Sequence, residues 1–308
     1  MLGAGLLGLE SSSTAPSWPL QHLRAPVLGS SHTAWHEAWQ VAAAPLDGHT
    51  EGIRWRRAGD LLFGVIELAE TPGGADLRTL SNQAYARIFR LLEAQALPHL
   101  WRIWNYMADI NGTAAGLERY RQFNLGRAEA FEQGARSVVG RVPAACALGV
   151  AGGPLSVAFL AGPTAAEPLE NPRQVSAYHY PAQYGPRSPT FSRAALVHPP
   201  GQELLFISGT ASIVGHESVH LGDVVAQTRE SMDNVAVVLE QAQRRSRCGG
   251  HALHDLSYRA YVRHAADAPL VQAVMAERVG AAPLVCVQAD VCRAELLVEI
   301  EAHGLRPL

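Results

Sequence analysis

The stretch ELLFISGTAS, residues 203–212, decides the fold together with the segment that follows it. Its apolar run ends in a turn that contains glycine, which predicts a strand. In LGDVVAQTRESMDNVAVVLEQAQRR, residues 221–245, apolar side chains recur at helical spacing and predict an amphipathic helix. The C-terminal half therefore begins with a strand that leads into a long helix.

The same alternation continues to the end of the chain. LSYRAYVRHA (256–265) predicts a strand, and LVQAVMAERVG (270–280) predicts a helix. PLVCVQADV (283–291) and ELLVEIEAHG (295–304) predict the last two strands. The predicted order is strand, helix, strand, helix, strand, strand.

The first half of the chain repeats this order in a weaker form. Residues 60–68 predict a strand, residues 80–97 an amphipathic helix and residues 100–110 a strand. Residues 116–135 predict a second helix, and residues 144–162 predict two strands around a Gly-Gly pair. An element order that occurs twice indicates an internal duplication. We therefore predict an α+β fold with two domains, each a mixed β-sheet with two helices packed on one face.

Composition sets the predicted boundaries of the domains. Residues 1–30 are rich in Ser, Pro and Gly and are predicted to run loosely. The Pro- and Glu-rich stretch PTAAEPLENPRQ, residues 163–174, joins the two halves. The N-terminal domain is therefore predicted to span residues 31–170, and the C-terminal domain residues 171–308.

The bulk properties argue against several classes of function. The chain has 308 residues, of which 48% are hydrophobic and 17% are charged, and its net charge is −3. This charge provides no general attraction for nucleic acid or an anionic membrane surface. The apolar start MLGAGLLGL is too short to span a bilayer, and no later segment reaches the ~18 apolar residues that a spanning helix needs. We expect a soluble cytoplasmic protein with no nucleic-acid or membrane partner.

The cysteines give no sign of a metal site. Cys146, Cys248, Cys286 and Cys292 form no CxxC pair, and no Cys/His cluster has the spacing of a zinc site. Free thiols fit a reducing compartment. We therefore predict no metal and no disulfide framework.

The segment VCRAELLVEIEAHG, residues 291–304, carries two glutamates on one face of a predicted strand. Glu299 and Glu301 alternate with apolar residues, which is typical of a half-buried strand that shows its carboxylates to water. Alternatively, one carboxyl group is a proton donor and Cys292 is its neighbour in a pocket. The alternation alone favours the solvent-exposed interpretation.

The order and spacing of the C-terminal half resemble those of the YjgF-type imine deaminase superfamily. The matching stretches are LFISGTAS, VVAQTRESMDNVAVVLEQA and PLVCVQADVCRAELLVEIEA. The resemblance implies a fold like that of chorismate mutase, a trimer with sites between subunits, and an acidic residue at Glu299. The deaminases carry a substrate-binding arginine on the penultimate strand, where this chain has Leu284. Imine deaminase activity is therefore not expected.

Longer motifs resemble the chorismatase family over nearly the whole chain from about residue 35. They are RIWNYMADIN, GLERYRQFNLGRAEAF, NPRQVSAYHYPAQYGPRSPTFSRA and SGTASIVGHES. The resemblance implies cleavage of the enolpyruvyl ether of chorismate with release of pyruvate, without a metal or an organic cofactor. Members leave a dihydroxycyclohexadiene carboxylic acid, 3-hydroxybenzoate, or 3- and 4-hydroxybenzoate together. The resemblance also implies that the C-terminal domain carries most of the active site.

The resemblance assigns roles to three residues near the reaction centre. Glu299 occupies the position of the chorismatase catalytic glutamate, which protonates the methylene of the enol ether. Slow protonation of carbon needs a positioned acid whose pKa is raised towards neutrality. Cys292 matches a cysteine that marks the hydroxybenzoate-forming enzymes, whereas Ala211 resembles the hydrolysing subgroup. The two residues leave the product open.

The two carboxylates of chorismate require arginines with planar donor forks. The loop YHYPAQYGPRSPTFSR supplies Tyr180, Tyr184, Arg187 and Arg193 as candidate substrate-binding residues. Arg193 and Tyr180 are predicted to hold one carboxylate. Arg127 is a further candidate from the N-terminal half.

Three functions remain open at this point. The leading hypothesis is a chorismatase that makes hydroxybenzoate and pyruvate. The second is hydrolysis of chorismate to 3,4-dihydroxycyclohexa-1,5-dienoate and pyruvate. A third, from another class, is a non-catalytic YjgF-like protein that binds a small metabolite. Because members of the superfamily assemble as trimers, the resemblance implies a homotrimer. A monomer is the alternative, since the duplication could supply the same interfaces within one chain.

Overall fold

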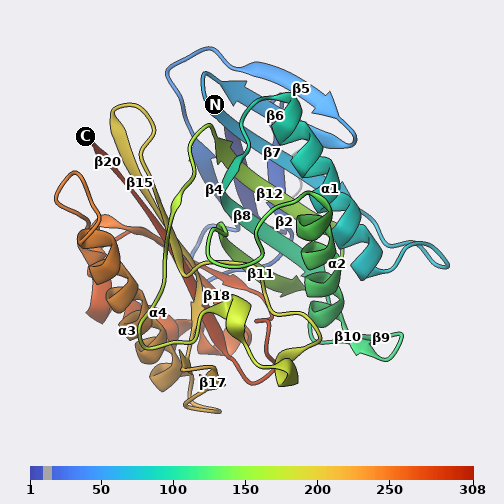
Figure 1. The fold of residues 1–308 in the computed structure, drawn as a ribbon. Coiled ribbons are helices and arrows are strands. Elements are labelled where there is room, and N and C mark those ends of the chain that lie inside the picture. The colour runs from blue at the N-terminus through green and yellow to red at the C-terminus, as the bar shows by residue number, and fades with distance from the viewer. Residues whose placement is uncertain (10–15) are drawn as a thin grey trace.

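Two large β-sheets face each other, and the long helices lie on their outer sides (Figure 1). The structure is a computed structural model, and it describes residues 1–9 and 16–308. The N-terminal sheet has the strand order β11-β8-β12-β7-β6-β5. Its strands are β5 (Leu46–Thr50), β6 (Ile53–Ala58), β7 (Leu61–Leu68), β8 (His99–Ala108), β11 (Ala144–Val150) and β12 (Leu155–Gly162). Helices α1 (Leu77–Ala94) and α2 (Arg119–Gln133) cover its outer face.

The C-terminal sheet has the strand order β13-β14-β15-β20-β18-β19-β3. Its strands are β3 (Val27–Leu28), β13 (Glu167–Leu169), β14 (Ala194–Val197), β15 (Gln202–Ala211), β18 (Ser257–Val262), β19 (Leu284–Gln288) and β20 (Val298–Pro307). Helices α3 (Val224–Gln243) and α4 (Ala268–Val279) pack on its outer face. The inner faces of the two sheets share one hydrophobic core, so the sheets act as a sandwich.

The two halves have the same topology. The order β6-β7-β12-β8-β11 in the first half matches β14-β15-β20-β18-β19 in the second half. In each half the two strands joined by the second helix pair in parallel, and the other neighbours pair antiparallel. The predicted duplication is therefore confirmed, as is the α+β fold with two helices on one face of each mixed sheet.

The long helices begin and end where local chemistry permits. The side chain of Asp76 accepts a hydrogen bond from the Thr79 amide at the start of α1. The side chain of Asp223 accepts one from the Ala226 amide at the start of α3. At the end of α4, Gly280 takes a φ of 63°, which a side chain would disfavour. In the described part of the chain, no helix is both long and apolar enough to cross a membrane.

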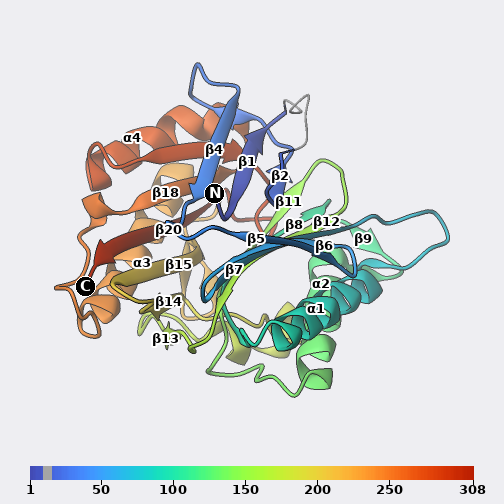
Figure 2. The same ribbon diagram turned by 90° about the horizontal axis from the view of Figure 1, so that it is seen from above.

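The N-terminal segment is ordered where it is described, so the prediction of a loose segment over residues 1–30 is wrong there. Strands β1 (Gly3–Gly8), β2 (Leu20–Leu23) and β4 (Ala34–Trp39) form a third, smaller sheet. This sheet lies across the open side between the two large sheets, where Leu2 and Leu7 are buried in the shared core (Figure 2). Part of the predicted loose segment, residues 10–15, lies outside the described residues.

Short elements complete the chain. Two small hairpins and four 3-10 turns connect the larger elements. They are β9 (Thr113–Ala114), β10 (Leu117–Glu118), β16 (Ile213–Val214), β17 (Glu217–Ser218), η1 (Ala177–His179), η2 (Ala182–Tyr184), η3 (Leu253–Asp255) and η4 (Ala265–Asp267).

The face of β20 that carries the two glutamates is covered by the other sheet. Glu299 is 4% exposed and Glu301 is 5% exposed, so the solvent-exposed interpretation of this strand is wrong. Glu301 is ion-paired with Arg102 and lies 3.2 Å from Arg259 Nη1, and Trp104 Nε1 donates to it at 3.1 Å. Alternation predicted the shared face correctly, but it could not show that this face is interior.

The duplication leaves an equivalent of the Glu299 position in the first half. Ser156 pairs with Tyr106 on β8 in the same way that Glu299 pairs with Tyr261 on β18. The two tyrosine hydroxyls lie 2.8 Å apart between the sheets. At the first-half position, Gln21 of β2 donates a hydrogen bond of 3.2 Å to Ser156 Oγ. The small N-terminal sheet therefore fills the cleft on that side.

Candidate active site

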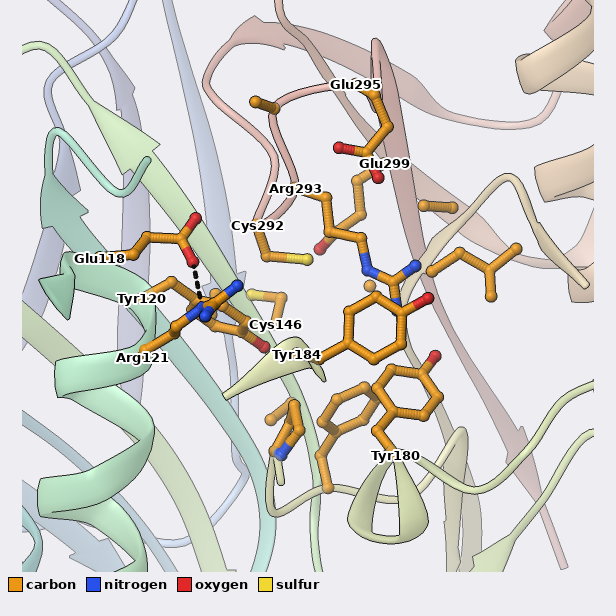
Figure 3. Close-up of a pocket in the computed structure, with 18 of the residues that line it drawn as sticks. Glu118, Tyr120, Arg121, Cys146, Tyr180, Tyr184, Cys292, Arg293, Glu295 and Glu299 are labelled. Carbon is orange, nitrogen blue, oxygen red and sulfur yellow. Dashed lines mark hydrogen bonds and ion pairs between the residues drawn. The ribbon is translucent and has the colours of Figure 1, made fainter. Parts of the chain in front are cut away.

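A cavity of about 420 Å³ opens between the two halves, next to Glu299 (Figure 3). Helix α2 and β11 of the first half form one wall, including Tyr120 and Cys146. The loop before β14, the end of β15 and the loop before β20 form the other walls. This size suits a small organic ligand. Both halves of one chain are therefore needed to complete the cavity.

Glu299 lies in the wall of this cavity as an unpaired acid. Within the residues that the structure describes, its carboxyl group has no hydrogen-bond or ion-pair partner. The pKa of Glu299 is raised to about 8, mainly by burial and also by the nearby charge of Glu301, whereas the charges of Arg102 and Arg193 oppose the rise. A carboxyl group in this setting holds its proton at neutral pH and can donate it to a ligand.

A bulge in β15 makes room for the Glu299 carboxyl group. The pairing between β15 and β20 shifts between Ile207 and Thr210, where β15 contains one extra residue. A Cβ atom at Gly209 would lie 1.9 Å from Glu299 Oε1. Glycine at this position therefore fixes where the carboxyl group can lie.

Replacing Gly209 by alanine is expected to displace the Glu299 carboxyl group and to lower kcat about 100-fold, because small errors in the position of a reacting group are costly. Gly152→Ala is the matched control, since no atom lies within 4 Å of the added Cβ. Steady-state kinetics and thermal melting check the two variants. A Gly209→Ala variant with wild-type kcat would show that the carboxyl group needs no such space.

Cys292 and Ala211 lie together beside Glu299. Ala211 is the register partner of Glu299 across β15 and β20, and Cys292 packs against the small hydrophobic cluster that contains Ala211. The pKa of the Cys292 thiol is raised to about 12, mainly by burial and also by the charge of Glu299, whereas the charge of Arg293 opposes the rise. Cys292 is therefore a neutral thiol that can donate a proton, and not a thiolate nucleophile.

The loop before β14 brings three predicted substrate-binding residues together. Arg193 Nη2 donates to the Tyr180 hydroxyl at 2.7 Å and to the Val175 carbonyl at 3.0 Å. The rings of Tyr180 and Tyr184 lie 5.5 Å apart, and both line the cavity. The buried Nε of Arg193 has no hydrogen-bond partner in the described chain, so one donor remains available to a ligand.

Arg187 does not reach the cavity, so the expectation that it binds substrate is corrected. Its Nη1 lies 2.9 Å from Glu132 on α2, and its side chain is 46% exposed. Arg121 Nη2 makes a parallel connection by donating to the Gln183 carbonyl at 3.2 Å. Arg187 therefore fastens the tyrosine loop to the first half of the chain.

Arg127 does reach the cavity, although it lies on a helix. It is 2% exposed, donates to Asn124 Oδ1 at 2.8 Å and packs over the ring of Phe123. Its buried Nε has no hydrogen-bond partner among the described residues. This part of α2 faces the C-terminal half, which explains why the arginine is not solvated.

Sequence reasoning missed several residues that line the cavity. They are Glu118, Tyr120, Arg121, Cys146, Arg293 and Glu295. Arg293 directly follows Cys292, which was the only local signal for it. The lining therefore contains four arginines against two carboxylates besides the protonated Glu299, and it favours an anionic ligand.

Metal-binding groups are sparse near this cavity. In residues 1–9 and 16–308, no group of three or more His, Cys, Asp or Glu side chains is arranged to hold a metal ion. The lining itself offers carboxyl, thiol, phenol and guanidinium groups.

A duplicated α+β fold that holds a protonated carboxyl group in a cationic cavity has the features of an enzyme that transfers a proton to an anionic small molecule. Comparison with known proteins supports this class. Residues 37–161 match the family model described as chorismatase FkbO/Hyg5-like, N-terminal.

Known relatives extend the match to most of the chain. A chorismatase of Streptomyces rapamycinicus is 41% identical over an alignment of 274 positions, which covers 86% of this chain and 80% of the relative. A 3-hydroxybenzoate synthase of Streptomyces hygroscopicus is 35% identical over an alignment of 315 positions, which covers 97% of this chain and 92% of the relative. A crystal structure of a chorismatase matches with a TM-score of 0.89 and 36% identity, covering 98% of this chain and 92% of the other.

The chain therefore belongs to the chorismatase family. Family membership makes the chain an enzyme, and the alternative of a non-catalytic metabolite-binding protein is set aside.

Proposed function

We propose that the protein cleaves the enolpyruvyl ether of chorismate and releases pyruvate and a hydroxybenzoate. The observation that carries this proposal is the buried Glu299 carboxyl group, which has a pKa of about 8 and faces a cavity lined by arginines. Protonation of an enol ether requires a positioned acid of this kind, because the methylene carbon accepts a proton only slowly from water.

In the first step Glu299 gives its proton to the terminal methylene of the enolpyruvyl group. The electron pair of the double bond forms the new C–H bond, and an oxocarbenium ion remains. The Glu299 carboxylate then faces this cation and stabilises it by its negative charge. The nearby Arg193 limits the cost of the new negative charge, because its own charge already lowers the pKa of Glu299.

The second step decides the product. In one route the ring hydroxyl attacks the adjacent ring carbon, the bond from that carbon to the ether oxygen breaks, and pyruvate leaves with this oxygen, while the hydroxyl proton returns to the Glu299 carboxylate. The epoxide that remains takes up a proton on oxygen, opens and loses a ring proton, which yields hydroxybenzoate with no net consumption of water. Attack by water instead consumes one water molecule and leaves 3,4-dihydroxycyclohexa-1,5-dienoate. The neutral thiol of Cys292 is proposed to favour hydroxybenzoate, because it can transfer a proton while the ring becomes aromatic. The proposed product is 3-hydroxybenzoate, with 4-hydroxybenzoate as a possible companion.

The charge of the cavity suits the substrate. Chorismate carries two carboxylates, and the lining supplies guanidinium groups from both halves of the chain. Arg193 with Tyr180 is placed to bind one carboxylate, and Arg127 approaches from the opposite wall. Since one chain completes the cavity, the proposed reaction does not require the homotrimer, which stays a prediction.

Incubation of the purified protein with chorismate, without added cofactor, tests the proposal. Products are separated by chromatography and identified by mass. Pyruvate with hydroxybenzoate supports the proposal, and pyruvate with the dihydroxycyclohexadienoate replaces the aromatic product by the hydrolytic one. Unchanged chorismate contradicts the proposed substrate.

Replacing Cys292 by alanine is expected to redirect the product while pyruvate release continues. The ring step loses its proton-transfer group, which contributes about 100-fold or more in general acid–base catalysis. Hydroxybenzoate should therefore fall and dihydroxycyclohexadienoate should rise, as measured by product ratios. Cys286→Ala is the matched control, because Cys286 is buried in the helix-side core of the second half. An unchanged product ratio in Cys292→Ala would make the thiol a bystander.

A further inference from the structure

Helix α3 buries two amide side chains, those of Gln227 and Asn234, against the C-terminal sheet. Burying an amide among apolar side chains costs free energy unless its donors and acceptors find partners. The partners of the two amides therefore show which parts of the chain they hold in place.

Asn234 holds the end of β15. Its Nδ2 donates to the carbonyls of Ala211 at 3.2 Å and Ile213 at 3.0 Å. Its Oδ1 accepts from Arg173 Nη1 at 3.0 Å and from Asn171 Nδ2 at 3.2 Å. Both donors and both lone pairs of the amide are thus used. Since Ala211 is the last residue of β15, the strand end beside the cavity is tied to the helix beneath it.

Gln227 holds the start of β20. Its Oε1 accepts from the Leu297 amide at 2.7 Å. Its Nε2 donates to the carbonyls of Glu295 at 3.0 Å and His220 at 3.2 Å. Leu297 directly precedes β20, and Glu299 is the second residue of that strand. Gln227 therefore fixes the point at which the chain enters the strand that carries the acid.

The two amides act on either side of the register pair that contains the acid. On the cavity side of the bulge, β15 and β20 share the register pairs of Thr210 with Ile300 and of Ala211 with Glu299. A bulge disrupts the ladder locally, so so short a ladder leaves the strand ends less firmly held than a continuous one does. Hydrogen bonds from a helix to both strand ends restore a fixed spacing between them.

The first half of the chain provides an internal comparison. There the register pair of Ser156 with Glu67 is equivalent to that of Glu299 with Ala211, and β7 and β12 pair in continuous register through it. The bulge is therefore a feature of the half that carries the acid.

The helices of the two halves differ in the same way. Counted from the aspartate that caps each helix, Gln227 of α3 corresponds to Leu80 of α1, which is buried in the apolar core. Asn234 corresponds to Arg87, whose Nη1 reaches outward to the Glu51 carbonyl at 3.3 Å. Because both halves have the same topology, the fold itself does not require an amide at either position.

We propose that Gln227 and Asn234 are positioning residues, which hold the ends of β15 and β20 at the spacing that directs the Glu299 carboxyl group into the cavity. The proposal rests on the proposed function of this cavity. It assigns the two amides to the transfer of the proton and not to the binding of substrate, because their hydrogen bonds go to the chain behind the acid.

The main test introduces the first-half residue into the second half. Gln227→Leu is expected to lower kcat for pyruvate release from chorismate about 10- to 100-fold with little change in KM, because a small displacement of a reacting group is costly. Burial is the main cause of the raised pKa of Glu299, so a displaced and hydrated carboxyl group should lose its proton at lower pH. The fall of kcat with pH should therefore move to lower pH in this variant.

Two conservative variants and a matched control complete the test. Gln227→Glu keeps an oxygen acceptor for the Leu297 amide and is expected to retain more of kcat than Gln227→Leu. Asn234→Asp keeps the acceptor for Arg173 but loses both donations to the strand end, so its kcat should fall and its pH profile should shift. Thr228→Val is the control, because Thr228 is equally buried in α3 and its hydroxyl donates to the Val224 carbonyl of the same helix at 2.7 Å.

The remaining outcomes contradict the proposal. It is wrong if Gln227→Leu and Asn234→Asp keep the wild-type kcat and pH profile while the wild-type enzyme turns over chorismate, and the proposed function then stands. It is also wrong if KM rises at unchanged kcat, or if kcat falls with an unchanged pH profile, which is the result of losing folded protein. Thermal melting measures that loss, and Gln227→Glu with Asn234→Asp decide the matter if the leucine variant does not fold. If the wild-type enzyme leaves chorismate unchanged, the proposed function fails and the positioning role fails with it.

Discussion

Replacing Glu299 by glutamine is expected to reduce pyruvate release from chorismate about 1000-fold. The carboxamide fills the same space but has no acidic proton to transfer to carbon, and a positioned general acid contributes on the order of 10²–10⁴ in rate. Steady-state kinetics measures the loss, and inhibition by 3-hydroxybenzoate shows that the cavity still binds a ligand. Glu277→Gln is the matched control at an exposed position. A glutamine variant with more than a tenth of wild-type activity would remove Glu299 from the mechanism.

The same acid sets the expected pH dependence of kcat. Glu299 has a pKa of about 8, and it must be protonated to act. Activity should therefore be full below this pKa and fall about tenfold per pH unit above it. A kcat that instead rises from pH 7 to pH 9 would indicate that a base, and not this acid, drives the reaction.

Replacing Glu301 by alanine is expected to cost about 3–5 kcal/mol in the free energy of unfolding, because it leaves the buried Arg102 without an ion-pair partner, whereas Arg259 keeps its ion pair with Glu37. Arg102 and Arg259 both lie against the Glu301 carboxylate, and all three side chains are less than a tenth exposed. Denaturant unfolding measures the loss, and Glu277→Ala is the exposed control. A loss below about 1 kcal/mol would mean that the network relaxes or hydrates when the glutamate is removed.

Replacing Glu301 by glutamine tests whether this buried carboxylate influences the pKa of Glu299. In Glu301→Gln the negative charge is lost, and this charge helps to raise the pKa of Glu299. The fall of kcat with pH should therefore move to lower pH in this variant. A pH profile identical to that of the wild type would show that burial alone sets the acidity of Glu299.

Local periodicity was enough to predict the repeated order of strands and helices. The apolar spacing of residues 221–245 corresponds to α3, and the alternation in residues 295–304 corresponds to β20. These signals arise within one element, so they survive without knowledge of the rest of the fold. The repeat itself then predicted the two-sheet architecture.

Signals that depend on distant partners could not be found in this way. Glu301 meets Arg102, which is 199 positions away in the sequence, so its burial was invisible. The short apolar run at Gly3–Gly8 becomes a strand only because β2 and β4 flank it. Arg187 was predicted to bind substrate because it lies in the loop that carries Tyr180 and Tyr184, but its ion-pair partner Glu132 lies on a helix of the other half.

The residues of the candidate site were predicted from the family resemblance and from the charge of the substrate that it implies, and not from a local pattern. Glu299, Cys292, Ala211, Tyr180, Tyr184, Arg193 and Arg127 all line the cavity. Within β20, alternation placed Glu299 and Glu301 on the same face and could not separate an acid from a structural anion. The difference comes from packing, because only Glu301 lies at ion-pair distance from arginines, namely Arg102 of the opposite sheet and Arg259 of the adjacent strand β18.

The duplicated fold contains a second position equivalent to that of Glu299, and in the first half this position holds Ser156. A carboxyl group at that position would meet the side chain of Gln21 and the neighbouring Glu67 instead of an open cavity. Restoring the acid in the first half would therefore not create a second catalytic centre, because β2 already occupies the space. In the proposed function the second copy carries the acid, whereas the first copy binds the N-terminal sheet through the hydrogen bonds of Gln21 to Trp104 and Ser156.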